Sequence, residues 1–294
     1  MPGIVGPVTF CCNVGVNAGV RPEGRGELAE RVAEAWHDPE RLRSLVLGAL
    51  DGGSGREVLP AAERLREIDE DAERGTLVLA LALRGCAEHR RAEDVLLRHI
   101  RTHGGGADTW FALAPLASWR GSTADVDTAL DNALRYDPDH ADALAWGYKH
   151  QARRHGDEHA VRWLTERSRQ SWRATVMLGE LALHRGDAGS AVQLFASACD
   201  LRPRGPGPLA AAARALAAAG RDDECARLVV ERWTGSCGPW PLIEAVEACL
   251  RRGRAGDAAL ALARLRGVEL DADAVERAAD LSLRVDAACL AAGI

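Results

Sequence analysis

Apolar residues recur at helical spacing, in segments separated by Gly or Pro, from about residue 39 to about residue 270. Residues 107–140 and 172–205 repeat one order of residue types, counted from Ala107 and Trp172. Leu occupies position 7, Ala or Gly position 8, Gly position 15, Ala position 27 and Pro position 32. Glycine permits a tight turn, small residues let two helices approach, and proline ends the second helix. The pattern predicts helix–turn–helix units and no strands in this span.

Poorer copies of the same unit begin at five other places: Pro39, Glu73, Ala141, Pro206 and Pro239. The chain is therefore expected to hold seven units, the first opened by Asp38 as helix cap and Pro39 at the first helical position. A further helix over 272–292, after Asp271, would cover the last apolar face. We expect three segments: an arm at 1–25, a repeat array at 26–270 and a capping helix at 271–294.

The spacing resembles the tetratricopeptide repeat, a 34-residue helix–turn–helix with W-x2-L-G-x2-Y, then A-x3-F, then P. Trp110, Leu113 and Ala114 carry the first part in one unit, and Ala191, Phe195 and Pro203 carry the second part in the other. The Tyr of the pattern is replaced by Ala117 and Ala182. The resemblance implies an all-α superhelical solenoid of antiparallel helix pairs, and it implies a scaffold or adaptor that binds proteins rather than an enzyme.

Residues 1–25 differ from the rest, because Met1 to Val20 carries no charge and its short β-branched runs are cut by Gly and Pro. This composition predicts a short non-helical arm. Two interpretations stay open: a disordered or loosely docked terminus, or a recognition segment that contacts a partner or the protein's own groove. Cys11 and Cys12 in this arm are expected to be a reduced, inert pair rather than a metal site.

Composition and charge further narrow the class of protein. A net charge of −6 argues against non-specific binding to nucleic acid, and no apolar stretch reaches the ~20 residues that cross a membrane. Arginine supplies every basic residue except Lys149, which with the Ala and Gly content is typical of a GC-rich bacterial, actinobacterial-like, chain. The first basic residue is Arg21, which argues against a secretory signal and for a cytoplasmic protein with reduced cysteines.

In the repeat family, the first helices line a concave groove, with side chains at positions 2, 5, 9, 12 and 13 facing inward. Carried onto this chain, these positions give the candidate peptide-binding residues Arg84, Phe111, Trp119, Lys149, Arg153, Arg173, Glu180, His184 and Arg214. Residues 149–173 hold seven Lys or Arg against three acids. The set favours an acidic or carboxylate-terminated peptide, with Phe111 and Trp119 as an apolar floor. The alternative is a solvated face with ordinary ion pairs.

Other sites find less support. His155 and His159 are four apart, but Gly156 should break a helix between them, so no zinc is expected. His89, His99 and His103 are expected to face solvent, as are Asp69, Glu70 and Asp71 in a charge run at a helix end. No catalytic motif occurs, and no cofactor is expected. The leading hypothesis is a non-catalytic protein-binding module; the alternative is an accessory subunit of a biosynthetic or signalling enzyme that uses the N-terminal arm.

Eight tryptophans stand against two tyrosines and three phenylalanines. Trp110 and Trp172 fall at unit positions that pack in the core, and helical register directs Trp119 alone toward the groove. The tryptophans are therefore expected to be packing residues, with Trp119 as the functional candidate.

Overall fold

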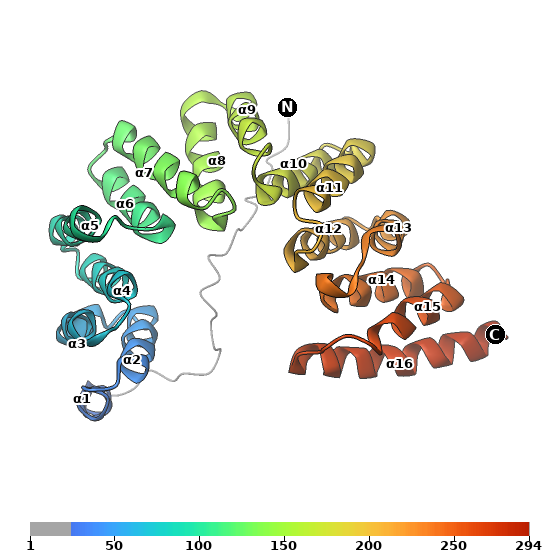
Figure 1. Cartoon of the computed structure of the whole chain (residues 1–294), viewed down its shortest axis with the longest axis horizontal. Coiled ribbons are helices and arrows are strands. Elements are labelled where there is room, and N and C mark those ends of the chain that lie inside the picture. The colour runs from blue at the N-terminus through green and yellow to red at the C-terminus, as the bar shows by residue number, and fades with distance from the viewer. Residues whose placement is uncertain (1–24, 294) are drawn as a thin grey trace, which may run out of the picture. The chain divides into compact units, whose positions relative to one another are not determined.

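The structure, a computed structural model, describes residues 25–293. Over these residues the chain forms sixteen α-helices and one short 3-10 helix, without a strand (Figure 1). They belong to two compact units that divide between Gly147 and Tyr148. The predicted all-α architecture of antiparallel helix pairs is confirmed.

Unit 1 contains three helix pairs after a short first helix. Its helices are α1 (Arg25–Glu34), α2 (Pro39–Asp51), α3 (Gly55–Ile68), α4 (Ala72–Gly85), α5 (His89–His103), α6 (Ala107–Trp119) and α7 (Thr123–Tyr136). The first helices of the pairs, α2, α4 and α6, pack side by side, and each also packs against its own second helix. Helix α8 (Ala141–His155) crosses the division between the units.

Unit 2 repeats this plan and ends in a longer helix. Its elements are α9 (Asp157–Arg167), α10 (Trp172–His184), α11 (Ala188–Leu201), α12 (Pro206–Ala218), α13 (Asp222–Arg232), η1 (Gly235–Cys237), α14 (Trp240–Arg251), α15 (Ala255–Leu265) and α16 (Ala272–Ala292). The first helices α10, α12 and α14 again form one layer, and α16 packs against α14 and α15. Asp271 caps α16 by accepting a hydrogen bond of 2.7 Å from the Ala274 amide.

The predicted unit starts agree with the observed helices to within one residue, from Pro39 in α2 to Trp240 in α14. Turn glycines explain why the pairs close tightly. Gly121 and Gly186 have φ of 75° and 79°, a left-handed conformation that costs glycine little. Arg25, which was assigned to the non-helical arm, is instead the first residue of α1. The rest of that arm, residues 1–24, lies outside the described residues.

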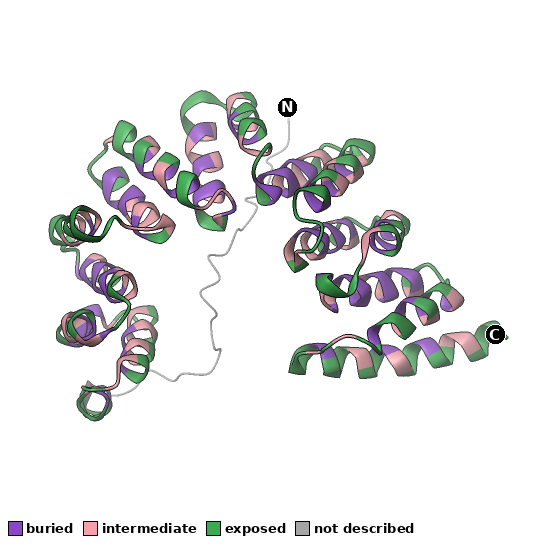
Figure 2. Cartoon of the chain, viewed as in Figure 1, coloured by how far each residue is buried: buried purple, intermediate pink, exposed green. Residues whose placement is uncertain are grey.

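The core of each unit lies both within the helix pairs and between successive pairs, and buried positions are most numerous on the first helices, such as α4 and α14 (Figure 2). Neighbouring pairs are also joined by polar contacts. The Glu73 carboxylate of α4 accepts hydrogen bonds from the Gly106 amide at 2.7 Å and from the Thr109 hydroxyl at 2.5 Å. Gly106 and Thr109 lie at the start of α6. Glu73 therefore supplies a hydrogen-bond acceptor to donors at the N-terminal end of the next first helix.

Two sequence expectations are wrong in detail. Asp69 is not a solvated carboxylate: it is 8% exposed and receives two hydrogen bonds from the Arg74 guanidinium, at 2.7 and 2.9 Å. His99 is 6% exposed, beside Thr76 and stacked on His103, so it does not face solvent. In each case a neighbouring element covers a side chain that local sequence leaves open.

Candidate functional site

The first helices of unit 1 expose an apolar stripe. Position 9 of the three units is Leu47, Leu81 and Pro115, and position 5 of the second and third units is Leu77 and Phe111. Leu81 is 41% exposed, and the other four side chains are half-buried. Because α2, α4 and α6 pack side by side, these residues share one face. We call these five residues with Arg84 the first-helix face of unit 1.

Arg84 stands at one end of this apolar stripe. It lies three residues after Leu81 on α4, so the two share one side of the helix. Burial alone lowers the pKa of the half-buried guanidinium, and within residues 25–293 no carboxylate lies within ion-pair distance of it. Arg74 on the same helix differs, since it reaches Glu40 at 2.8 Å and Asp69 at 2.7 Å. The first-helix face of unit 1 therefore carries a desolvated cation that has no counter-ion in the described part of the chain.

Phe111 and Trp119 do not form a joint floor. The Phe111 ring lies 5.1 Å from His140 and 5.8 Å, edge-on, from Trp146. Trp119 lies eight residues further along α6, which is about 12 Å of helix, and its ring lies 4.5 Å from His89 at the start of α5. Trp119 is 57% exposed and borders a shallow depression with Ala87, His89 and Arg90. It belongs to the edge of the layer, near the turn between α4 and α5.

The first helices of unit 2 carry charge where those of unit 1 are apolar. Position 9 is Glu180 on α10, Arg214 on α12 and Glu247 on α14. Glu180 and Glu247 are half-buried, and Arg214 is exposed. Burial raises the pKa of Glu180, and nearby His184 offsets part of that rise. We call Glu180, Arg214 and Glu247 the charge row of unit 2.

The remaining candidate residues of unit 2 differ in exposure and in the contacts that they make. On α8, Lys149 is half-buried and Arg153 is exposed. Arg173 is exposed but holds its guanidinium over the Trp172 ring, 4.5 Å from its centroid. His184 is exposed, and its Nδ1 lies 2.8 Å from the Glu180 carbonyl oxygen. Arg173 therefore packs on Trp172, and His184 contacts the backbone of the last turn of α10.

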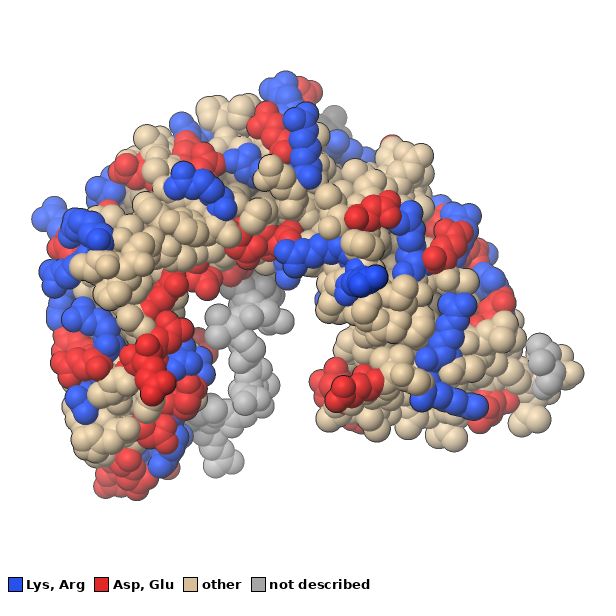
Figure 3. Space-filling view, viewed as in Figure 1, with Lys and Arg blue, Asp and Glu red and all other residues tan. Residues whose placement is uncertain are grey.

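Some of the cations of the basic segment 149–173 make structural contacts. Arg167 stacks on Trp163 at 3.8 Å and donates a hydrogen bond of 3.1 Å to the Trp163 carbonyl oxygen. Acidic and basic side chains alternate over the visible surface of each unit, with uncharged surface between them (Figure 3). The charge of this segment is thus divided between structural contacts and separate exposed arginines.

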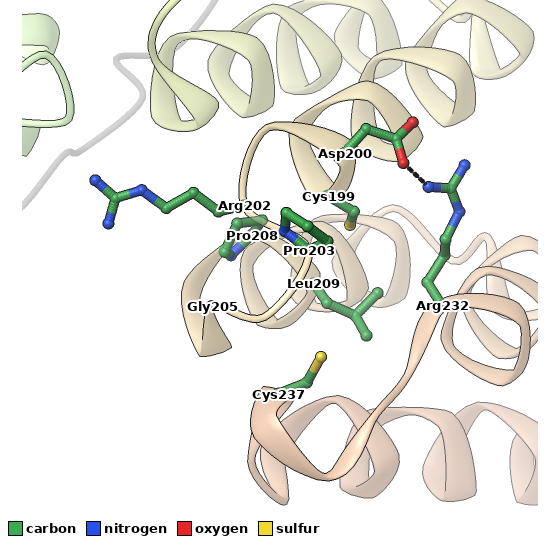
Figure 4. Close-up of a pocket in the computed structure, with 9 residues that line it drawn as sticks. All are labelled: Cys199, Asp200, Arg202, Pro203, Gly205, Pro208, Leu209, Arg232 and Cys237. Carbon is green, nitrogen blue, oxygen red and sulfur yellow. Dashed lines mark hydrogen bonds and ion pairs between the residues drawn. The ribbon is translucent and has the colours of Figure 1, made fainter.

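Unit 2 also holds a small cavity of about 50 Å³ beneath η1, lined by both Cys199 and Cys237 (Figure 4). Both cysteines are buried, and burial raises the pKa of the Cys199 thiol to about 11. An ion pair between Asp200 and Arg232 lies beside it. Because a thiol with that pKa stays protonated at neutral pH, the Cys199 side of the cavity offers a poor nucleophile.

Metal-ligating side chains do not gather in the part of the chain that the structure describes: no group of three or more His, Cys, Asp or Glu could hold an ion. His155 and His159 do come close, with ring centroids 4.7 Å apart. Gly156 separates α8 from α9 between them, with φ of 85°, as the sequence indicates. None of the helices between residues 25 and 293 is long and apolar enough to span a bilayer.

The helical register of the sequence indicates further residues of the two faces that the list of candidate peptide-binding residues does not include. Leu47, Leu77, Leu81, Pro115 and Glu247 occupy the same unit positions as the candidates. Counting position 9 along the units shows the change from apolar residues in unit 1 to charged residues in unit 2. Position 9 therefore distinguishes the apolar first helices of unit 1 from the charged first helices of unit 2. The overall charge of segment 149–173 does not make this distinction.

No family model matches the sequence, and a search of curated proteins finds no match. Solved structures similar to this chain include tetratricopeptide-repeat proteins. One is a tetratricopeptide repeat protein from Parabacteroides merdae, 14% identical, with a TM-score of 0.37, covering 83% of this chain and 98% of that chain. Another is yeast Tom70, 11% identical, with a TM-score of 0.45, covering 92% and 59%. A third is the TPR2AB domain of yeast Sti1 in complex with pHSP90, 14% identical, with a TM-score of 0.36, covering 85% and 98%.

Proposed function

We propose that this chain is a non-catalytic protein-binding module, and that the first-helix face of unit 1 binds an extended segment of another protein. The observation that carries the proposal is Arg84, a half-buried cation that has no counter-ion among residues 25–293 and lies beside exposed Leu81. A surface that served only folding would not need to hold a guanidinium there. A carboxylate from a partner would restore the electrostatic interactions that burial removes from Arg84.

The chemistry of this face defines the segment. Leu77, Leu81 and Phe111 offer apolar surface. Fully burying an exposed side chain of this kind contributes about 1.5–3 kcal/mol, and these partly buried side chains contribute less. Arg84 adds a charge-assisted hydrogen bond of about 1.5–3 kcal/mol to an acceptor. The ligand is therefore an apolar segment with one Asp, Glu or terminal carboxylate, rather than a uniformly acidic peptide. This is narrower than the acidic ligand expected from segment 149–173.

Selection from a displayed library of short random peptides, against the full chain, tests the proposal. Enriched peptides should pair apolar residues with a carboxylate, and their binding should weaken about tenfold or more in the Arg84→Glu variant. Arg66→Glu is the matched control, because Arg66 is an exposed arginine on the second helix α3. Circular dichroism establishes that both variants fold.

Two results would contradict the proposal. One is enrichment of peptides whose binding is equal in Arg84→Glu and Arg66→Glu. The other is a partner that binds the full chain, does not respond to Arg84→Glu, and is lost when residues 1–24 are deleted. That second result would favour the accessory subunit that makes contact through its N-terminal arm.

A further inference from the structure

The charge row of unit 2 contains one member that is neutralised inside the protein. The Arg277 Nε on α16 donates a hydrogen bond of 2.7 Å to the Glu247 Oε1, and Arg251 lies 3.6 Å from the same carboxylate. Arg277 reaches Glu247 from α16, whereas Arg251 reaches it from the same helix, α14. Glu247 is therefore occupied and is not available to a ligand.

Glu180 and Arg214 are different. Neither forms an ion pair in the part of unit 2 that the structure describes, and they do not form one with each other. Glu180 is half-buried, and burial raises its pKa while nearby His184 offsets only part of that rise. Arg214 is exposed, and it interacts electrostatically with Glu244, a half-buried carboxylate of α14. Two opposite charges thus remain unpaired on the neighbouring helices α10 and α12.

The spacing of these helices sets the spacing of a matching ligand. Packed helix axes lie about 8–10 Å apart, and an extended chain advances about 3.3 Å per residue. A segment that crosses α10 and α12 therefore moves from one position 9 to the next in about three residues. Helices α10 and α12 do pack against each other, so Glu180 and Arg214 are separated by one such step.

We propose that Glu180 and Arg214 of the charge row of unit 2 bind an extended segment, in which a basic residue meets Glu180 and an acidic residue three positions away meets Arg214. The proposal rests on the protein-binding role proposed above and adds a second face with a different ligand chemistry. The occupant is a segment of a partner protein. The order of its two charges fixes the direction in which it crosses the helices.

A charge reversal tests this order. The same random-peptide selection is repeated with the double variant Glu180→Lys with Arg214→Glu, in the full chain. Peptides enriched on the parent should carry Lys or Arg and Asp or Glu three residues apart, and they should bind the double variant about tenfold more weakly. The variant should select peptides with the two charges exchanged. Each single variant should lose the preference at one peptide position only.

The matched control reverses a pair of exposed charges on the second helix α13, Arg227→Glu with Glu231→Lys. It should leave the enriched peptides unchanged. If peptides respond to Arg84→Glu but not to the Glu180 and Arg214 reversal, the inference fails while the proposed function stands. If no peptide is enriched on the full chain, both fail. Enriched peptides that respond equally to the control reversal would also overturn the inference.

Discussion

Gly179 on α10 faces the ring of Phe195 on α11 at a distance that leaves no room for a side chain. A Cβ on Gly179 would lie 2.5 Å from the nearest carbon of the Phe195 ring, and Phe195 is fully buried. These residues occupy positions 8 and 24 of the unit that starts at Trp172. The small residue at position 8 is therefore required because the aromatic residue of the second helix packs directly on the first-helix backbone.

Gly179→Ala is expected to destabilise unit 2 by about 1–2 kcal/mol. Overpacking costs about 1–3 kcal/mol, and the better helix propensity of Ala returns up to about 1 kcal/mol. Urea unfolding followed by circular dichroism measures the change. Gly48→Ala is the control, since a Cβ on this helical glycine meets nothing within 4 Å and should stabilise by up to about 1 kcal/mol. Adding Phe195→Leu to Gly179→Ala should recover part of the loss; strictly additive effects would disprove the contact.

Asp69→Asn is expected to lower stability at pH 7 by about 1–3 kcal/mol, because it removes the charged acceptor of Arg74. The hydrogen bonds from Arg74 hold the pKa of Asp69 below 3.8, its ordinary value. The wild type therefore keeps this contribution above about pH 4 and loses it as pH falls through the lowered pKa. Stability measured by urea unfolding from pH 7 to pH 2 should converge for the two proteins at the acid end. Glu70→Gln, at an exposed neighbour, should show no such convergence.

Glu73→Ala is expected to destabilise unit 1 by about 1–3 kcal/mol, because it leaves the Gly106 amide and the buried Thr109 hydroxyl without their acceptor. Glu73→Gln keeps an acceptor oxygen and should cost less. Hydrogen exchange supplies the local measurement: the Gly106 amide should exchange faster in the Ala variant. Unchanged exchange at Gly106 would show that Glu73 does not hold the start of α6.

Glu180→Gln is expected to raise stability at neutral pH while it removes the preference for a basic ligand residue. Burial raises the pKa of Glu180 above its ordinary value of 4.5, so its ionised form costs folding free energy. That cost is absent below the unfolded pKa and grows as pH rises through the folded pKa. Thermal unfolding should therefore favour the Gln variant at pH 7 and show no difference near pH 3. An equal effect at both pH values would indicate a packing change; Glu231→Gln is the exposed control.

Much of the fold follows from local sequence. Gly121 and Gly186 predict turns, and Pro39 and Pro206 predict helix starts, because these effects act within a few residues. Helical register also predicts which side of each first helix is exposed, since the period of 3.6 is a local property. Leu47, Leu81 and Pro115 were therefore available from the sequence as one apolar row.

Which charges are neutralised was decided by the tertiary structure. Glu247 receives Arg277 from 30 residues away, whereas Arg84, Glu180 and Arg214 receive no ion-pair partner in the described residues. Composition and register cannot show this, because an ion pair depends on a side chain from another element reaching within about 4 Å. The sequence by itself determined the helix pairs and their exposed positions. Packing between pairs determined which of those positions remain open to a ligand.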